Sequence, residues 1–400
     1  MDWNENTVAD VNVQTTSNQA RISNMMTQED GHYSFELPMN NNYEIQPFND
    51  EYPLNGVSTF DLVLISKHIL GINSFANPYQ YIAADVNQSG SITAFDMVQL
   101  RRLILNIDTH FQNNTSWKFV ESAFTFDMEN PAEADYPTLS SVQNLAHDMA
   151  IDFIAVKIGD VNGNARTNSL QQAESRRAQG SFTIETANID LKAGQSYTLE
   201  FTANELRAIT GYQFTLDFGS LQFEQLQEGI AKIGNFGLNN IEKGYITTSW
   251  NQPATDDTES ANNQLFKVEL TATEDGKLSE QLSIISRPTA VEAYSQGGEL
   301  LDVKLTFNTT ERLSQAFEIF QNQPNPFDEQ TNISFFLPET SEVELTLMDE
   351  MGRTLRTIKT NKAAGIQSID IKSADLPSGL IYYQISTKYG TQTRKMLHIE

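Results

Sequence analysis

Apolar and polar residues alternate along most of the chain, and this pattern predicts short β-strands. Between residues 179 and 310, "SYTLEFTA", "GYQFTLDF", "LFKVELTA" and "LDVKLTF" place an apolar residue at every second position, with turn residues between them. Such spacing is typical of a β-sandwich. Residues 317–400 repeat the pattern in "NISFFLP", "EVELTLMDEMG" and "LIYYQIS", which predicts a second strand-rich unit.

Residues 1–49 carry the same alternation in "GHYSFELP" and "NYEIQPF", and we interpret them as the C-terminal part of a truncated β-sandwich. The opening "MDWNENTVADVNVQ" has neither a basic start nor an apolar core, so it does not resemble a signal peptide. We therefore expect the chain to be the C-terminal part of a longer protein.

A helical pattern occurs twice within residues 50–166. "VSTFDLVLISKHIL" and "ITAFDMVQLRRLIL" align at a constant offset of 35 residues, since 96 − 61 = 35 for their aspartates. Ser58 and Thr93 are placed to cap the two helices. Each helix has an apolar face, so the pair is expected to pack face to face. The apolar residues are Leu62, Ile65, Ile69 and Leu70 in the first helix, and Met97, Leu100, Ile104 and Leu105 in the second.

The expected fold class is a multi-domain, mainly β protein. It combines Ig-like β-sandwiches with one small α-helical, EF-hand-like module at residues 50–166. Residues 167–178 include the polar, unpatterned "NSLQQAESRRA" and are predicted to be a linker.

The composition limits the classes of partner and the location that the protein can have. The chain has 400 residues, no cysteine and a formal net charge of −26. The charge argues against a nucleic-acid partner, because phosphates would be repelled. It agrees with an extracellular protein that binds divalent cations, and equally with a requirement for solubility alone. The absence of cysteine means that no disulfide holds the chain together. The sequence contains no run of 18 apolar residues, so it predicts no membrane-spanning helix.

Residues 85–96, "DVNQSGSITAFD", predict a calcium loop. Oxygen side chains stand at positions 1, 3, 5 and 12, a carbonyl is available at position 7, and Gly90 at position 6 permits the sharp turn. The alternative is a polar turn before a helix. The expected ligands are Asp85, Asn87, Ser89, Ser91 and Asp96.

Two further segments each hold half of such a loop. "GDVNGNA" supplies positions 1, 3 and 5 at Asp160, Asn162 and Asn164, whereas "NGVSTFD" supplies positions 7, 9 and 12 at Gly56, Ser58 and Asp61. One interpretation is a single calcium site split across about 100 residues, which loop-closure entropy permits. The other is an ordinary turn together with a vestigial loop. The split site would leave Asp50 outside.

The paired loop–helix units resemble a dockerin, and this resemblance implies Ca²⁺ as the cofactor and a cohesin-like domain or another surface protein as the partner. The first unit departs from the family at Tyr52 and Leu54, which stand where oxygen ligands belong. The positions of the family's hydroxyl pairs hold Thr59 and Phe60, then Ala94 and Phe95. The resemblance places later partner-binding positions at Ser66, Lys67, Arg101 and Arg102.

The strand-rich block at residues 179–310 is similar to a cohesin-type or carbohydrate-binding-type sandwich in "GYQFTLDF", "GYITTSW" and "EAYSQGGELLDVKLTF". The resemblance implies a protein partner, which could be a second copy of the chain, or a polysaccharide. Tyr212, Tyr245 and Trp250 could stack on sugar rings or belong to the core.

The last unit, residues 317–400, resembles the type A sorting domain of the type IX secretion system. The resemblance is carried by "QNQPNPFDEQTNISFFLP", "LTLMDEMGRTL", "DLPSGLIYYQIS" and "KMLHIE". It implies recognition by the type IX secretion machinery and a secreted, extracellular location at the outer cell surface.

Catalytic motifs are missing from the sequence. It contains no HExxH, GxSxG, P-loop or GxGxxG, and its five histidines are scattered. We expect a non-catalytic region that binds calcium and a protein or carbohydrate. The alternative is a set of accessory modules of a polysaccharide-degrading or proteolytic hydrolase whose catalytic domain lies upstream.

Overall fold

The computed structural model divides into two compact units, Met1–Thr186 with Asp190–Thr306, and Ala187–Ile189 with Phe307–Glu400. Within the described residues, no helix has the length and apolar character to cross a membrane. Most of the predicted linker at residues 167–178 falls outside the described residues. The structure describes residues 1–127, 131, 134–168, 178–252, 263–309, 317–337, 340–362, 365–374 and 376–399.

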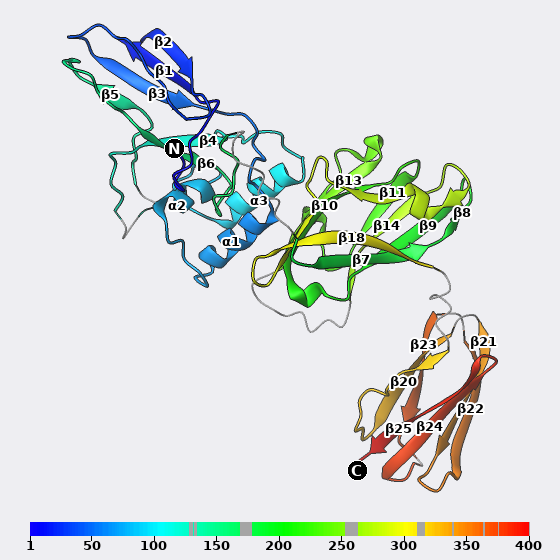
Figure 1. Ribbon diagram of the computed structural model, residues 1–400. Helices are drawn as coiled ribbons and strands as arrows, with labels where there is room; N and C mark the ends of the chain where they lie inside the picture. The colour runs from blue at the N-terminus through cyan, green and yellow to red at the C-terminus, as the bar shows by residue number, and fades with distance from the viewer. Residues whose placement is uncertain are drawn as a thin grey trace. The chain divides into compact units, whose positions relative to one another are not determined.

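The first unit begins with an antiparallel sheet in the order β2-β1-β3-β5 (Figure 1). Strand β5 comes from nearly 100 residues beyond β3, so the strands before residue 49 complete their sheet with a distant segment. A separate antiparallel pair, β4 and β6, shares one hydrophobic cluster with this sheet. The boundary at residue 49 remains a prediction. The strands are β1 (Asn12–Ser17), β2 (Ala20–Met26), β3 (Tyr43–Phe48), β4 (Trp117–Glu121), β5 (Ser140–Val142) and β6 (Phe153–Lys157).

Three helices lie between β3 and β4 in the chain: α1 (Thr59–Ile69), α2 (Pro78–Ala84) and α3 (Ala94–Ile104). The predicted caps are confirmed, because Ser58 and Thr93 each form a capping box with the aspartate three residues later. Helices α1 and α3 share a hydrophobic cluster that includes Leu62, Ile65, Leu100 and Ile104.

The predicted apolar stripe is wrong at the end of α1. Ile69 and Leu70 are 39% and 51% exposed. The equivalent residues at the end of α3, Ile104 and Leu105, are 2% and 1% exposed, and their carbonyls accept hydrogen bonds from Thr289 and Thr247 of the sandwich.

A curled sheet in the order β11-β14-β9-β7-β18-β17-β10-β13-β12, with β16 beside β10, forms the sandwich of the first unit (Figure 1). Aromatic side chains fill its centre: the Tyr212 ring stacks on Phe182, Phe214 and Trp250 at centroid distances of 5.8, 5.6 and 5.5 Å. The main strands are β7 (Ser181–Asn188), β9 (Ser196–Thr202), β10 (Ile209–Asp217), β11 (Gln222–Glu228), β12 (Phe236–Gly237), β13 (Tyr245–Asn251), β14 (Gln264–Thr271), β16 (Ser283–Ile285), β17 (Glu292–Ser295) and β18 (Leu300–Thr309). Shorter elements are β8 (Asp190–Leu191), β15 (Gly276–Lys277) and α4 (Leu278–Gln281).

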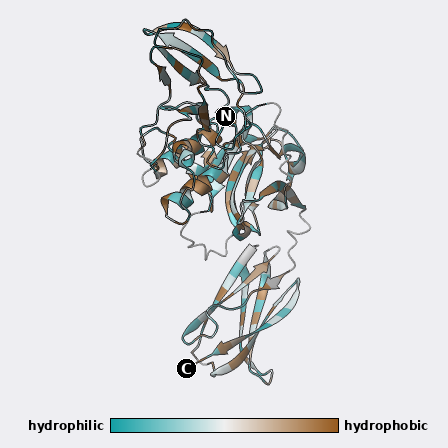
Figure 2. Ribbon diagram, turned by 60° about the vertical axis from the view of Figure 1, so that its left-hand side comes forward, coloured by the Kyte–Doolittle hydropathy of each residue, from teal (hydrophilic) through white to brown (hydrophobic). Residues whose placement is uncertain are grey.

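The second unit contains two antiparallel sheets, β19-β20-β23 and β22-β21-β24-β25. Hydrophobic and hydrophilic residues alternate along its strands (Figure 2), and the apolar rows form a core of their own that includes Phe335, Leu345 and Tyr383. The strands are β19 (Glu318–Ile319), β20 (Gln330–Leu337), β21 (Ser341–Met348), β22 (Thr354–Lys362), β23 (Gly365–Lys372), β24 (Gly379–Thr387) and β25 (Gly390–His398). The mainly β class, with β-sandwiches and one small helical module, is confirmed.

Candidate metal centre

The intact loop at residues 85–96 wraps its own backbone around two carboxylates. Asp85 Oδ1 and Oδ2 each accept a hydrogen bond at 2.8 Å, from the amides of Ser89 and Gly90. Asp96 Oδ1 accepts from the Asn87 amide at 3.1 Å, and its Oδ2 accepts from the Thr93 amide at 2.8 Å. Position 1 therefore closes the turn and position 12 joins the loop to α3.

The two half-loops around Asp160 and Asp61 meet and reproduce this arrangement. Asp160 accepts from the amides of Asn164 at 3.1 Å and Ala165 at 2.7 Å, which are again positions 5 and 6. Asp61 Oδ1 accepts from the Asn162 amide at 3.3 Å, and its Oδ2 accepts from the Ser58 amide at 2.9 Å. The structure thus brings together the segments that sequence spacing assigned to one split loop.

Direct contacts close the split loop between its halves. The Asn55 side chain donates to the Arg166 carbonyl at 2.7 Å and accepts from the Arg166 amide at 3.0 Å. A Cβ on Gly56 would lie 2.8 Å from Asp160 Oδ2, so a side chain here would collide with the carboxylate. Asp50 does not belong to the split loop: its Oδ1 accepts a hydrogen bond from the Ser116 amide at 2.7 Å.

The side-chain amide oxygens at position 3 are evidence for a cation site in both loops. Asn87 Oδ1 and Asn162 Oδ1 are buried, and neither has a hydrogen-bond partner among the residues that the structure describes. A buried acceptor without a partner costs free energy, and such acceptors are rare in native proteins. Since the two loops leave the same atom unpaired, a ligand at the same place in each would satisfy both.

Electrostatics favour a cation in the split loop. Asp61 and Asp160 are 0% and 1% exposed. Burial and the nearby Asp160 charge hold the pKa of Asp61 well above its usual range, and burial raises the pKa of Asp160 to about 6. In the intact loop, burial raises the pKa of Asp85, and the Asp96 charge adds to the effect. A divalent ion would remove the cost of holding these carboxylates ionised.

The donor chemistry of both loops suits calcium. Each offers two carboxylates, with amide, hydroxyl and carbonyl oxygens as the other donors, and Ca²⁺ prefers such hard oxygen ligands. No group of three His, Cys, Asp or Glu residues that could hold a metal occurs within the described ranges.

Of the predicted partner-binding residues, Arg101 contacts the sandwich, whereas Arg102 pairs with a residue close to its own helix. Arg101 Nη2 donates to Asn251 Oδ1 of the sandwich, whereas Arg102 forms an ion pair with Asp108 at 2.7 Å. Ser66 and Lys67 lie in the second half of α1, where their carbonyls accept the hydrogen bonds that end the helix. Thr59 stands at a position of the family's hydroxyl pairs but was not among the predicted partner-binding residues, and its amide donates to Gln213 Oε1 at 2.6 Å.

The candidate sugar-stacking aromatics lie mostly inside the sandwich. Tyr212 and Trp250 are 0% and 3% exposed, and Tyr245 is half-buried. The first two belong to the aromatic core, so they present no platform to a ligand.

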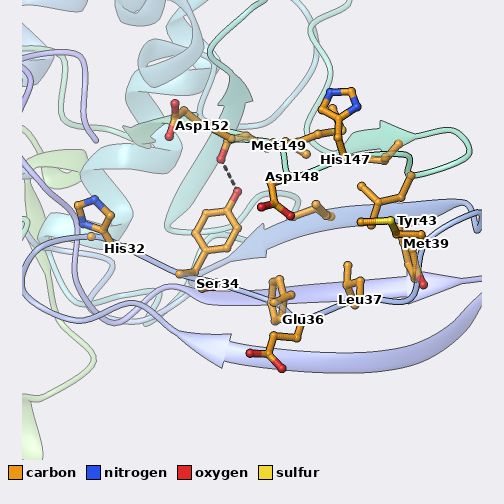
Figure 3. A pocket seen from close by; sticks show the side chains of 18 of the residues that line it. His32, Ser34, Glu36, Leu37, Met39, Tyr43, His147, Asp148, Met149 and Asp152 are labelled. Atoms are coloured by element: carbon orange, nitrogen blue, oxygen red, sulfur yellow. Dashed lines mark hydrogen bonds between the residues drawn. The ribbon is translucent and has the colours of Figure 1, made fainter.

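A groove of about 1010 Å³ lies beside the sheet β2-β1-β3-β5 (Figure 3). Residues 30–39 form one wall and residues 147–152 form the other. The Tyr33 hydroxyl joins the walls by donating to the Ile151 carbonyl at 2.5 Å, and burial raises the pKa of Tyr33 to about 12. Tyr43 and Ile45, from the core of the sheet, also line the groove.

A buried lysine beside the split loop makes stability depend on pH. Lys157 Nζ donates to the carbonyls of Pro53 at 2.8 Å and Ile158 at 3.1 Å. Burial lowers the pKa of Lys157 to about 7, although the charge of Asp160 opposes this shift. Between pH 7 and roughly 10.5 the unfolded chain therefore binds more protons than the folded chain.

We expect the free energy of unfolding to rise with pH across this window, by up to roughly 1.4 kcal/mol per pH unit. Urea unfolding at saturating calcium between pH 7 and 9.5 would measure the slope. Lys157→Met should remove it, whereas Lys192→Met, at a lysine with a 63% exposed side chain, should retain it. Equal slopes in all three proteins would contradict the assignment.

Two family models match parts of the chain. Residues 55–105 match the dockerin type I domain, and residues 323–400 match the secretion system C-terminal sorting domain. Dockerin type I domains are calcium-binding modules. The chain therefore combines a dockerin domain with a type IX sorting domain, and these indicate a secreted, cell-surface protein. No curated protein matches the chain.

Solved structures similar to this chain include several cohesins. The third cohesin ScaC of Acetivibrio cellulolyticus, in complex with the ScaB dockerin, has 14% identity and a TM-score of 0.25, covering 31% of this chain and 94% of that chain. The seventh ScaB type I cohesin of Pseudobacteroides cellulosolvens has 14% identity and a TM-score of 0.25, covering 32% and 88%. The Coh-OlpA–Doc918 complex of Clostridium thermocellum has 13% identity and a TM-score of 0.24, covering 31% and 94%.

Proposed function

We propose that this chain is a non-catalytic region of a secreted, modular cell-surface protein, and that its dockerin domain binds two calcium ions that hold the module folded. The observation that carries the proposal is the pair of buried, unpartnered amide oxygens at Asn87 and Asn162. Each lies in a loop with two carboxylates, and in both loops these accept from the amides at positions 3, 5, 6 and 9. Calcium would supply the missing partner in both loops.

We further propose that the sandwich binds protein rather than carbohydrate. The burial of Tyr212 and Trp250 prevents two of the three candidate aromatics from stacking on a sugar ring, and the third, Tyr245, is half-buried. The sorting domain would deliver the protein through the type IX secretion machinery, which supports attachment to the outer cell surface or release from it.

Replacement of Asp85 by alanine tests calcium binding at the intact loop. We expect Asp85→Ala to lose one ion and part of the calcium-dependent stability, because a bound ligand stabilises only the folded state. At a free calcium concentration 100 times the dissociation constant, one ion contributes about 2.7 kcal/mol.

Titration calorimetry would give the number of ions, and thermal unfolding with and without a chelator would give the stabilisation. Asp148→Ala, at an exposed aspartate outside both loops, is the control and should behave like the unsubstituted chain. Absence of calcium uptake by the unsubstituted chain would refute the proposal.

A further inference from the structure

The outward face of strands β10 and β13 is buried although it is polar. In both strands the apolar residues face the aromatic core, so the intervening residues would be expected to face water. Instead Gln213, Thr247 and Ser249 are 2%, 0% and 0% exposed. The register pairs Gln213 with Ser249 and Thr215 with Thr247, so these small polar side chains form one continuous row.

The ends of α1 and α3 cover this row. At the start of α1, the Thr59 amide donates to Gln213 Oε1 at 2.6 Å, and the Thr59 hydroxyl lies 2.7 Å from the Ser249 hydroxyl. At the end of α3, the Thr247 hydroxyl donates to the Leu105 carbonyl at 2.6 Å, and the Thr289 hydroxyl donates to the Ile104 carbonyl at 2.7 Å. The sandwich thus pairs helix-end groups that have no partner within their own helices.

Close packing accompanies these hydrogen bonds. The Phe60 ring stacks on Tyr294 with centroids 5.0 Å apart and an interplanar angle of 24°. A Cβ on Gly298 would lie 2.7 Å from the Phe60 ring, and a Cβ on Gly237 would lie 2.4 Å from the Leu105 carbonyl oxygen. Glycine at these two positions lets the sandwich approach the helices, because any side chain would collide with them.

The internal repeat of the module supplies a comparison within the same chain. Thr59 corresponds to Ala94, and Phe60 corresponds to Phe95, at the offset of 35 residues given by 94 − 59. Thr59 is 0% exposed, whereas Ala94 is exposed and Phe95 is 57% exposed. The contact therefore uses Thr59 and Phe60 at the start of α1, whereas the equivalent residues at the start of α3 remain exposed and α3 contributes through its C-terminal end.

We propose that the dockerin module and the sandwich are each other's partners within one chain, so that the Thr59 face is already occupied and does not recruit a separate protein. By the Thr59 face we mean Thr59 and Phe60 at the start of α1. Thr59 forms hydrogen-bond contacts with the polar side chains of Gln213 and Ser249 on the sheet, and the sandwich buries it completely. This inference goes beyond calcium binding and does not depend on it. It also argues against a second copy of the chain as the partner of this surface, which the resemblance to a cohesin-type sandwich allowed.

Cleavage of the folded chain between the two modules tests the proposal. Residues 169–177 would be replaced by a protease recognition sequence, and the full chain would be cut after folding into residues 1–168 and 178–400. We expect the two pieces to co-elute in size-exclusion chromatography. Separation of the unsubstituted pieces would overturn the proposal.

Thr59→Arg should separate the pieces, because a long charged side chain cannot occupy this buried position without losing the contacts to Gln213 and Ser249. Ala94→Arg is the matched control at the exposed, repeat-related position and should leave the pieces together. Circular dichroism of each cut protein would establish that both variants remain folded. Co-elution of folded Thr59→Arg pieces would also overturn the proposal.

A second measurement asks whether the face is closed to other copies. Two intact chains with different tags would be mixed at increasing concentration, and one tag would be used for capture. We expect each chain to remain monomeric and the second tag to stay unbound. Concentration-dependent capture that Thr59→Arg abolishes would show that the face pairs between chains, against the proposal.

Discussion

Asp160→Ala and Asp61→Ala are each expected to reduce calcium binding from two ions to one, and both should remove the same ion. The two carboxylates lie about 100 residues apart in sequence, yet each accepts hydrogen bonds from residues 161–165. If a single ion lies between them, removing either carboxylate removes a charged ligand of that ion. Titration calorimetry of each variant would give the stoichiometry.

A double variant distinguishes one split site from two separate weak sites. Asp61→Ala combined with Asp160→Ala should still bind one ion, the ion of the intact loop. Asp50→Ala serves as the control, because the Asp50 carboxylate accepts from the Ser116 amide outside the loop, and this variant should still bind two ions. Unsubstituted protein that binds a single ion, or an Asp160→Ala variant that still binds two, would contradict the split site.

Loop spacing was the most informative part of the sequence. The positions of Asp160, Asn162 and Asp61 in a loop template placed residues together that are far apart in the chain, and the structure brings them together. Spacing could do this because the ligand geometry of a calcium loop fixes the order of oxygen donors. It could not give the burial of both carboxylates, which depends on how β6 and α1 pack.

Sequence periodicity was weaker for contacts between elements. The alternation in "GYITTSW" correctly separates Ile246 and Trp250, which pair with Leu216 and Tyr212 of β10, from Thr247 and Ser249, which pair with Thr215 and Gln213. It predicts that the second pair faces away from the core, but small polar residues are equally suited to water and to a hydrogen-bonded partner. The contact with α1 and α3 could therefore not be read from the strand itself.

The same limit applies to strand pairing. "GHYSFELP" alternates as a strand would, but the structure describes residues 31–38 without strand assignment, and β3 pairs instead with β5. Pairing between distant segments depends on the packing of the whole sheet, since alternation identifies a face and not a neighbour.

Deletion of residues 317–400 is expected to stop surface display completely and to leave the remaining protein in the periplasm. The expectation rests on the match of residues 323–400 to the secretion system C-terminal sorting domain. The deletion should leave the rest of the fold intact, because the second unit has its own core around Phe335, Leu345 and Tyr383. Cell fractionation and surface labelling would locate the truncated chain.

Calcium-dependent thermal unfolding provides the folding control for this deletion. A truncated chain that melts like the first unit of the full protein, with the same calcium stabilisation, has lost only its export signal. A matched substitution, Met351→Ala, changes an 83% exposed side chain in the turn between β21 and β22 and should preserve display. Normal surface display of the truncated chain would show that the export signal lies elsewhere, whereas periplasmic retention of a folded chain places it in residues 317–400.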